Sequence, residues 1–166
     1  SSGLGGGPYA DFDGNLRGAD MSGERITITG KIYDGAGGLV TDAMVETWQT
    51  DAQGQYPAAD AAFSGWARQA CDLTTGMFTF QTIKPGCIAT SAGRQSPHVS
   101  IWIVARGINL GLHTRIYFAD EDNSADPVLA LIEPSRRQTL IASQQGGAYV
   151  FNVRLQGENE TVFFDL

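Results

Sequence analysis

The stretch His98-Val-Ser-Ile-Trp-Ile-Val104 is the most apolar run of the sequence, and the fold class can be argued outward from it. Side chains alternate across a β-strand, so Val99, Ile101 and Ile103 point to one face and the residues between them to the other. The first face is wholly aliphatic and suits a core. The second carries His98, Ser100 and Trp102, a mixture of polar and aromatic groups. The run therefore predicts a strand with a core on one side and a candidate site on the other.

The same period of two recurs along the chain, with turn signals such as Asp34-Gly35 and Lys84-Pro85-Gly86 between the runs. About seven short strands spaced in this way predict an all-β, two-sheet β-sandwich with long loops. One short helix is expected from Val128 to Glu133, capped by Asp126 with Pro127 at its first position. The other expected strands cover residues 26–33, 45–48, 77–83, 112–118, 149–155 and 161–166.

A length of 166 residues is enough for one sizeable core, so a single domain over residues 1–166 is expected. Residues 1–9 are predicted to form an N-terminal arm, because Gly3 to Gly7 offers almost no side chain for packing. Charged residues make up only 17%, and the net charge of −7 argues against nucleic acid or an anionic membrane as partner. The sequence contains no apolar run of about 20 residues, and a cytoplasmic location is expected.

Three residues are candidates for a site when the sequence is considered alone. An H-x-H pair on one strand face would aim two imidazoles at one metal, but Ser100 takes the second position, and a hydroxyl is a poor substitute there. His98 is therefore also compatible with a packed, hydrogen-bonded histidine. Tyr56 follows a turn and can face a pocket or solvent. Arg106 ends the apolar strand at a glycine, where a guanidinium can bind a carboxylate or simply be solvated.

Other catalytic patterns are missing from the sequence. It has no G-x-S-x-G elbow, no phosphate-binding G-x-x-x-x-G-K-[ST] loop and no H-E-x-x-H pair. The acidic run Asp120-Glu121-Asp122 lacks the spacing of a calcium loop and is interpreted as a solvated turn. From the residues alone, the prediction ends at a sandwich with an unassigned site.

Several segments together are similar to the intradiol ring-cleaving dioxygenases. The similarity extends over nearly the whole chain, from about Gly7 to Leu166. The ending looks specifically like the iron-free chain of the two-chain members of that family. The segments that carry the resemblance are Pro97-His-Val-Ser100, Ala105-Arg-Gly-Ile-Asn109, Leu112-His-Thr-Arg-Ile-Tyr-Phe118 and Gln156-Gly-Glu-Asn-Glu-Thr-Val-Phe-Phe-Asp165.

The resemblance implies four positions for ligands of ferric iron, two tyrosines and two histidines. Tyr56 matches the first tyrosine and His98 the first histidine, whereas Ile88 and Ser100 stand at the other two positions. The resemblance thus implies four vestigial ligand positions and no metal bound by this chain. Two further family positions also differ: Gln95 stands where an arginine is expected before the H-x-H, and Arg115 replaces a glutamine.

The resemblance also implies a partner, an iron-bearing beta subunit of the same fold, in a higher hetero-oligomer. That subunit would hold the Fe(III), and the shared pocket would cleave an aromatic acid, 3,4-dihydroxybenzoate, with O2. Gly7, Pro8, Tyr9 and Arg106 are the residues implied to line the pocket from this chain. Two alternatives stay open: a transthyretin-like sandwich that binds a ligand without turnover, and a shell subunit that does not touch the pocket.

Overall fold

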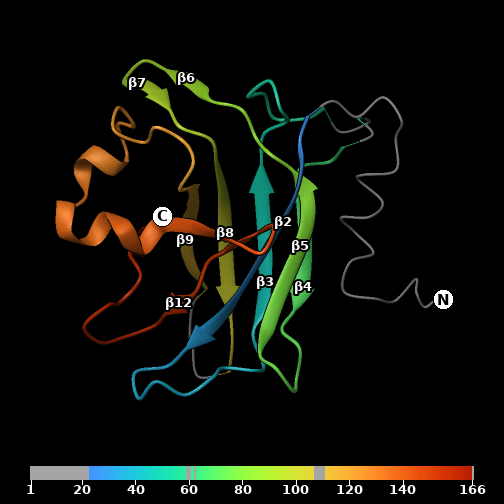
Figure 1. The fold of residues 1–166 in the computed structure, drawn as a ribbon, viewed down its shortest axis with the longest axis vertical. Helices are drawn as coiled ribbons and strands as arrows, with labels where there is room; N and C mark the ends of the chain where they lie inside the picture. The colour runs from blue at the N-terminus through green and yellow to red at the C-terminus, as the bar shows by residue number, and fades with distance from the viewer. Residues whose placement is uncertain (1–22, 59–60, 62, 107–110, 166) are drawn as a thin grey trace.

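The computed structural model describes residues 23–58, 61, 63–106 and 111–165, and its strands form two layers (Figure 1). In the view of Figure 1, β2 crosses in front of β3 and β8, and β5 lies in front of β4 and the lower part of β3. The strands are β2 (Arg25–Tyr33), β3 (Met44–Gln49), β4 (Trp66–Ala70), β5 (Met77–Ile83), β6 (Ile88–Thr90), β7 (Gly93–Gln95), β8 (His98–Val104), β9 (Leu112–Phe118), β10 (Ile141–Gln145), β11 (Ala148–Val150) and β12 (Val153–Arg154).

The two layers are joined through one strand, β10. In one layer β2 pairs antiparallel with β5 and parallel with β11 and β12. In the other, β4, β3, β8 and β9 follow one another in antiparallel order. Ile141 and Ala142 of β10 pair with β9, and the remaining three residues of β10 pair with β11. The predicted all-β sandwich is confirmed, with the layers connected along one edge.

The core lies between the layers and is built from the alternate residues of facing strands. Ile101 and Ile103 of β8 are fully buried, as their place on the core face predicts. They pack in one cluster with Ile28 of β2 and with Phe78 and Phe80 of β5. The two phenylalanine rings lie 6.1 Å apart between centroids. The aliphatic face of the 98–104 strand is therefore what fixes this strand in the fold.

One predicted strand is divided in the structure. The run from Tyr149 to Leu155 becomes β11 and β12, and the interruption lies at Phe151 and Asn152. The Asn152 side-chain oxygen accepts the hydrogen bond of the Lys31 amide at 3.0 Å, where a continuous strand would offer backbone. Phe151 still donates its amide to the Thr29 carbonyl at 2.8 Å. The Asn152 side chain thus replaces one backbone hydrogen bond of the strand pairing, and the chain continues along β2.

The predicted helix is present as a short 3₁₀ turn, η1 (Leu129–Leu131), and a second 3₁₀ helix, η2 (Pro134–Leu140), follows it. The cap residue of η1 is Val128 and not the predicted Asp126, whose carboxylate instead accepts the amides of Val128 and Leu129 at 2.8 and 2.9 Å from the turn before the helix. At the chain end, residues 161–165 contribute one isolated bridge, His113 to Phe164, instead of the expected strand.

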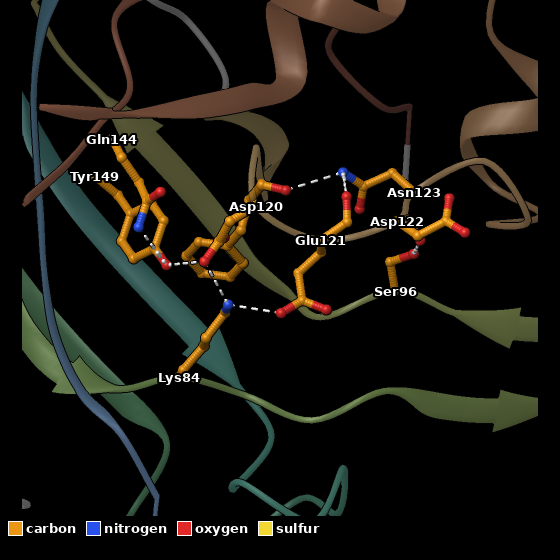
Figure 2. A network of polar contacts seen from close by, with 9 residues as sticks. Lys84, Ser96, Asp120, Glu121, Asp122, Asn123, Gln144 and Tyr149 are labelled. Carbon is orange, nitrogen blue, oxygen red and sulfur yellow. Dashed lines mark hydrogen bonds and ion pairs between the residues drawn. The ribbon is translucent and has the colours of Figure 1, made fainter.

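The acidic run is more than a solvated turn (Figure 2). Lys84 Nζ lies 3.1 Å from Asp120 and 2.6 Å from Glu121, and the Tyr149 hydroxyl donates to Asp120 at 2.9 Å. Burial raises the pKa of Asp120, but the bonds from Tyr149 and Lys84 outweigh this and leave it lowered. The network ties the loop after β9 to the end of β5.

Two absences hold within the described part of the chain. It contains no cluster of three or more His, Cys, Asp or Glu side chains that could hold a metal ion. None of its helices has the length and apolar character needed to cross a membrane.

Candidate active-site region

The structure brings three of the four positions that the family resemblance implies to be vestigial ligand positions to one end of the sandwich. His98 and Ser100 lie near the start of β8, on the face opposite the core. Ile88 begins β6 and pairs directly with Gln95 at the end of β7, two residues before the chain turns into Pro97 and His98. The β6–β7 hairpin therefore adjoins the strand that carries the two histidine positions (Figure 1).

His98 is a packed histidine in this chain. Its side chain is 4% exposed, its Nδ1 lies 2.9 Å from the Ser96 carbonyl, and its ring lies 5.4 Å from that of Tyr117 between centroids. Burial, and then the positive charge of Arg115, lowers the pKa of His98 to about 4. The imidazole is therefore neutral at neutral pH.

Arg115 occupies the space between these positions. It pairs directly with Ser100 across β8 and β9, so both side chains share the outer face. Its Nη1 donates to the Gln95 side-chain oxygen and to the Tyr117 hydroxyl, both at 3.1 Å. Its guanidinium also lies 5.8 Å from the centre of the Phe164 ring. A fixed cation thus lies among the residues that would surround a metal.

The series of hydrogen bonds that begins at Arg115 continues to a buried carboxylate. The Tyr117 hydroxyl donates to Asp126 Oδ1 at 3.2 Å, and Asp126 Oδ2 accepts the Ser96 amide at 2.8 Å. Burial raises the pKa of Tyr117 to about 12, although Arg115 acts in the opposite direction. Tyr117 is therefore a neutral phenol that links a cation to an anion. Sequence reasoning identified Asp126 only as a helix cap and did not identify Tyr117, whose signal was its place opposite His98 in the strand pattern.

Tyr56 is separated from this network. Its side chain is 60% exposed, in a loop that packs against the backbone just before β6. Gly54 permits that packing, because it has a φ of 81° and a Cβ there would overlap the Cys87 carbonyl oxygen. The loop thus places Tyr56 beside the hairpin.

A small hollow of about 290 Å³ adjoins Ser100 on the outer face of β3, β8 and β9. Trp48 and Trp102 line it, together with Glu46 and His113. Glu46 is already engaged there, because it accepts the Trp66 indole N–H at 3.2 Å and lies 3.7 Å from Arg68. The hollow is aromatic and shallow, and it lies outside the series of hydrogen bonds described above.

Arg106 lies at the opposite end of β8. Eight residues separate it from His98, which corresponds to roughly 26 Å along an extended strand. Its side chain is 92% exposed and its Nε lies 3.7 Å from Asp42, beside a cavity of about 770 Å³ that Leu39, Val40 and Leu155 also line. Gly7, Pro8 and Tyr9, the other predicted pocket residues, lie outside the described residues. The structure therefore keeps Arg106 apart from the vestigial positions.

Comparison with known proteins identifies the family of this chain. A family model described as Dioxygenase matches residues 9–157. The chain belongs to the intradiol ring-cleavage dioxygenase family. Two relatives in this family are protocatechuate 3,4-dioxygenase alpha chains. The one from Pseudomonas putida is 48% identical over 157 residues, covering 88% of this chain and 78% of the relative. The one from Burkholderia cepacia is 40% identical over 172 residues, covering 93% and 84%.

The chain is also similar to a beta chain and to solved structures of the intradiol family. The Burkholderia cepacia protocatechuate 3,4-dioxygenase beta chain is 29% identical over 167 residues, covering 88% of this chain and 70% of that one. An intradiol ring-cleavage dioxygenase from Tetranychus urticae superposes with a TM-score of 0.65 at 18% identity, covering 82% of each chain. The identity is thus higher to the two alpha chains than to the beta chain.

Members of the intradiol family depend on Fe(III), but the residues of this chain do not fit a ferric ion. An aliphatic side chain and a hydroxyl stand at positions 88 and 100, where the family resemblance implies a tyrosine and a histidine. Arg115 lies directly across from Ser100 on the outer face, and its positive charge would repel a cation there. His98 directs Nδ1 to a backbone carbonyl, and Tyr56 is mostly in solvent.

The depressed pKa of His98 predicts a pH-dependent stability. The ordinary value of 6.5 in the unfolded chain falls to about 4 in the fold, so the unfolded state takes up the proton first as pH falls. The unfolding free energy should be fully present above pH 6.5 and decline by about 3 kcal/mol between pH 6.5 and 4. Urea unfolding at half-unit pH steps measures this, with His98→Gln as the control that should lack the decline. Identical profiles for the two proteins would contradict it.

Proposed function

We propose that this chain is the alpha subunit of a protocatechuate 3,4-dioxygenase, without iron of its own, and that it completes a substrate pocket on an iron-bearing beta subunit. The proposal is based on one observation: two expected iron ligands are absent from a chain that otherwise matches an alpha chain over most of its length. Ile88 and Ser100 interrupt the ligand set, while identity to an alpha chain is 48% over most of the length. A chain that cannot hold the metal but keeps the fold is suited to serve a partner that holds it.

Arg106 is the residue we assign to the pocket from the described part of the chain. Its guanidinium lies just beyond the end of β8, and its ion pair among the described residues is a 3.7 Å contact with Asp42, whose side chain is itself 43% exposed. A contact of that length in water contributes little, so the guanidinium is available to another anion. Covering by a partner would partly remove it from water and strengthen a bidentate bond to a carboxylate. Gly7, Pro8 and Tyr9 are proposed to lie against the same substrate.

The proposed reaction converts 3,4-dihydroxybenzoate and O2 to 3-carboxy-cis,cis-muconate. Both oxygen atoms enter the product and the carbon–carbon bond between the hydroxyl-bearing carbons breaks, so no other reactant is needed. In this proposal the metal that supplies the oxygen chemistry belongs to the beta subunit. This chain binds and orients the acid through its carboxylate, which fixes the position of the ring without taking part in bond breaking.

Replacing Arg106 with alanine in the co-purified complex tests the assignment. We expect KM for 3,4-dihydroxybenzoate to rise about 10- to 100-fold, which corresponds to the loss of one charge-assisted contact, with kcat changed little. Catechol is the matched control, because it has the same ring and hydroxyls but no carboxylate, and its KM should not change. Arg94→Ala, at an exposed arginine of β7, serves as the protein control.

Each other outcome indicates a different function. An unchanged KM for both substrates would show that this chain only builds the shell around the pocket. An equal rise for catechol and for the acid would show that Arg106 positions the partner and does not bind the carboxylate. A complex with no turnover of either substrate would favour the non-catalytic binding module.

A further inference from the structure

We propose that Arg115 is a built-in cation that takes the place of the metal in this chain and keeps metal ions out of the vacated site. The inference goes beyond the function proposed above, because it concerns what now occupies the site and not how the chain serves a partner. It rests on contacts within the described residues.

The position of the guanidinium is defined by strands on both sides. Arg115 is the direct cross-strand neighbour of Ser100, and Tyr117 is the direct neighbour of His98. The guanidinium bonds Gln95, which is in turn the direct neighbour of Ile88 in the hairpin. Three of the four vestigial positions are thus direct cross-strand neighbours of Arg115 or of a residue to which Arg115 donates a hydrogen bond. A single side chain connects the elements that a shared metal ion would otherwise hold together.

The guanidinium donates its hydrogen bonds to oxygen atoms, the kind of atom that a metal ion would also bind. Nη1 donates to oxygen atoms of Gln95 and Tyr117 at 3.1 Å each, so these atoms face a positive charge. The Tyr117 hydroxyl in turn donates a hydrogen bond to Asp126, which is 1% exposed. The guanidinium and the carboxylate therefore balance each other through the phenol. The Phe164 ring covers the guanidinium at 5.8 Å and limits its movement.

A second cation at this place would be opposed in two ways. It would be repelled by the positive charge of the guanidinium, and it would compete for oxygen atoms that already accept hydrogen bonds. Restoring ligands at positions 88 and 100 should therefore not be sufficient to restore metal binding while Arg115 remains. Removal of the guanidinium is the additional change required.

Metal titration of designed variants of the full chain tests this inference. The first variant, Ile88→Tyr with Ser100→His, restores two ligand types and keeps Arg115. The second adds Arg115→Gln, and a matched control adds Arg94→Gln instead. The probe is Co²⁺ alone, whose visible spectrum reports its ligands, with iron content after purification as a second readout. We expect the Arg115→Gln variant to bind Co²⁺ at least about 100-fold more tightly than the other two.

Equal affinity in all three proteins, including no binding in any, would overturn the proposal. Because the new tyrosine can impair folding, the same comparison is made with Ser100→His alone against Ser100→His with Arg115→Gln. Co²⁺ should raise the Tm of the double variant, through His98 and the new histidine, and leave that of the Ser100→His protein unchanged. The same response in both proteins would also overturn it. Neither measurement depends on substrate or partner, so failure here is separate from failure of the proposed function.

Discussion

Asp126→Ala should lower the unfolding free energy by about 4 kcal/mol, a large share of the 5–15 kcal/mol typical of a domain. The carboxylate is 1% exposed and accepts four hydrogen bonds. Its donors are the amides of Ser96, Val128 and Leu129 at 2.8–2.9 Å and the Tyr117 hydroxyl at 3.2 Å. Truncation leaves these donors buried and unpaired, and each such group costs roughly 1–3 kcal/mol. Urea unfolding followed by tryptophan fluorescence measures the loss.

Two variants show whether the loss comes from these bonds. Asp126→Asn keeps the oxygen that faces three of the donors and turns an amide toward the Ser96 N–H, so it should cost about half as much. Asp122→Ala removes an exposed aspartate four residues away, whose carboxylate accepts only Ser124, and should cost less than about 1 kcal/mol. If Asp126→Ala were no more destabilising than Asp122→Ala, the buried network would have no role in stability.

Gly30→Ala should destabilise the fold by more than about 4 kcal/mol or prevent folding. Gly30 lies in the middle of β2, where the Phe151 carbonyl approaches the strand so closely that a Cβ would overlap it. The obstacle is backbone, held by the bond from the Phe151 amide to the Thr29 carbonyl at 2.8 Å. Relief would require separating β2 from the segment between β11 and β12. Soluble yield and thermal unfolding measure the effect.

Gly38→Ala is the control for the loss of a glycine as such. A Cβ at Gly38 would meet only the Asp34 carboxylate, 3.2 Å away at the end of a side chain that can move. The expected cost is below about 1 kcal/mol. A Gly30→Ala protein as stable as this control would show that β2 and Phe151 separate easily, contrary to the packing described here.

The sequence predicts this fold well wherever alternation is strong. The strands at 77–83, 98–104 and 112–118 have their predicted bounds, because the core face of each is mainly apolar, with Thr82 and Thr114 as the polar members. β4, β6, β7 and β10 were not predicted. They are short, and segments such as Trp66-Ala-Arg-Gln-Ala70 have few β-branched residues, so their pairing is decided by neighbours that the local sequence does not reveal.

The candidate site could be predicted only in part. The resemblance and the strand pattern placed His98 and Ser100 on the outer face, which the structure agrees with. The chain from Arg115 through Tyr117 to Asp126 was not predicted, because it joins β9 to a loop residue whose side chain also accepts an amide at the start of the η1 turn. The distance between Arg106 and His98 was available from the length of the strand, whereas the exposure of Tyr56 depends on how its loop packs.

The location of Arg106 and the vestigial positions at opposite ends of β8 has an evolutionary consequence. The strand is anchored by its aliphatic face, so substitutions at its amino-terminal end leave the placement of its carboxyl-terminal end unchanged. After a gene duplication, one copy can therefore lose the function at one end of the strand while selection preserves the function at the other end. Substitutions at residues 98 and 100 can thus alter one end of β8 without displacing residue 106 at the other.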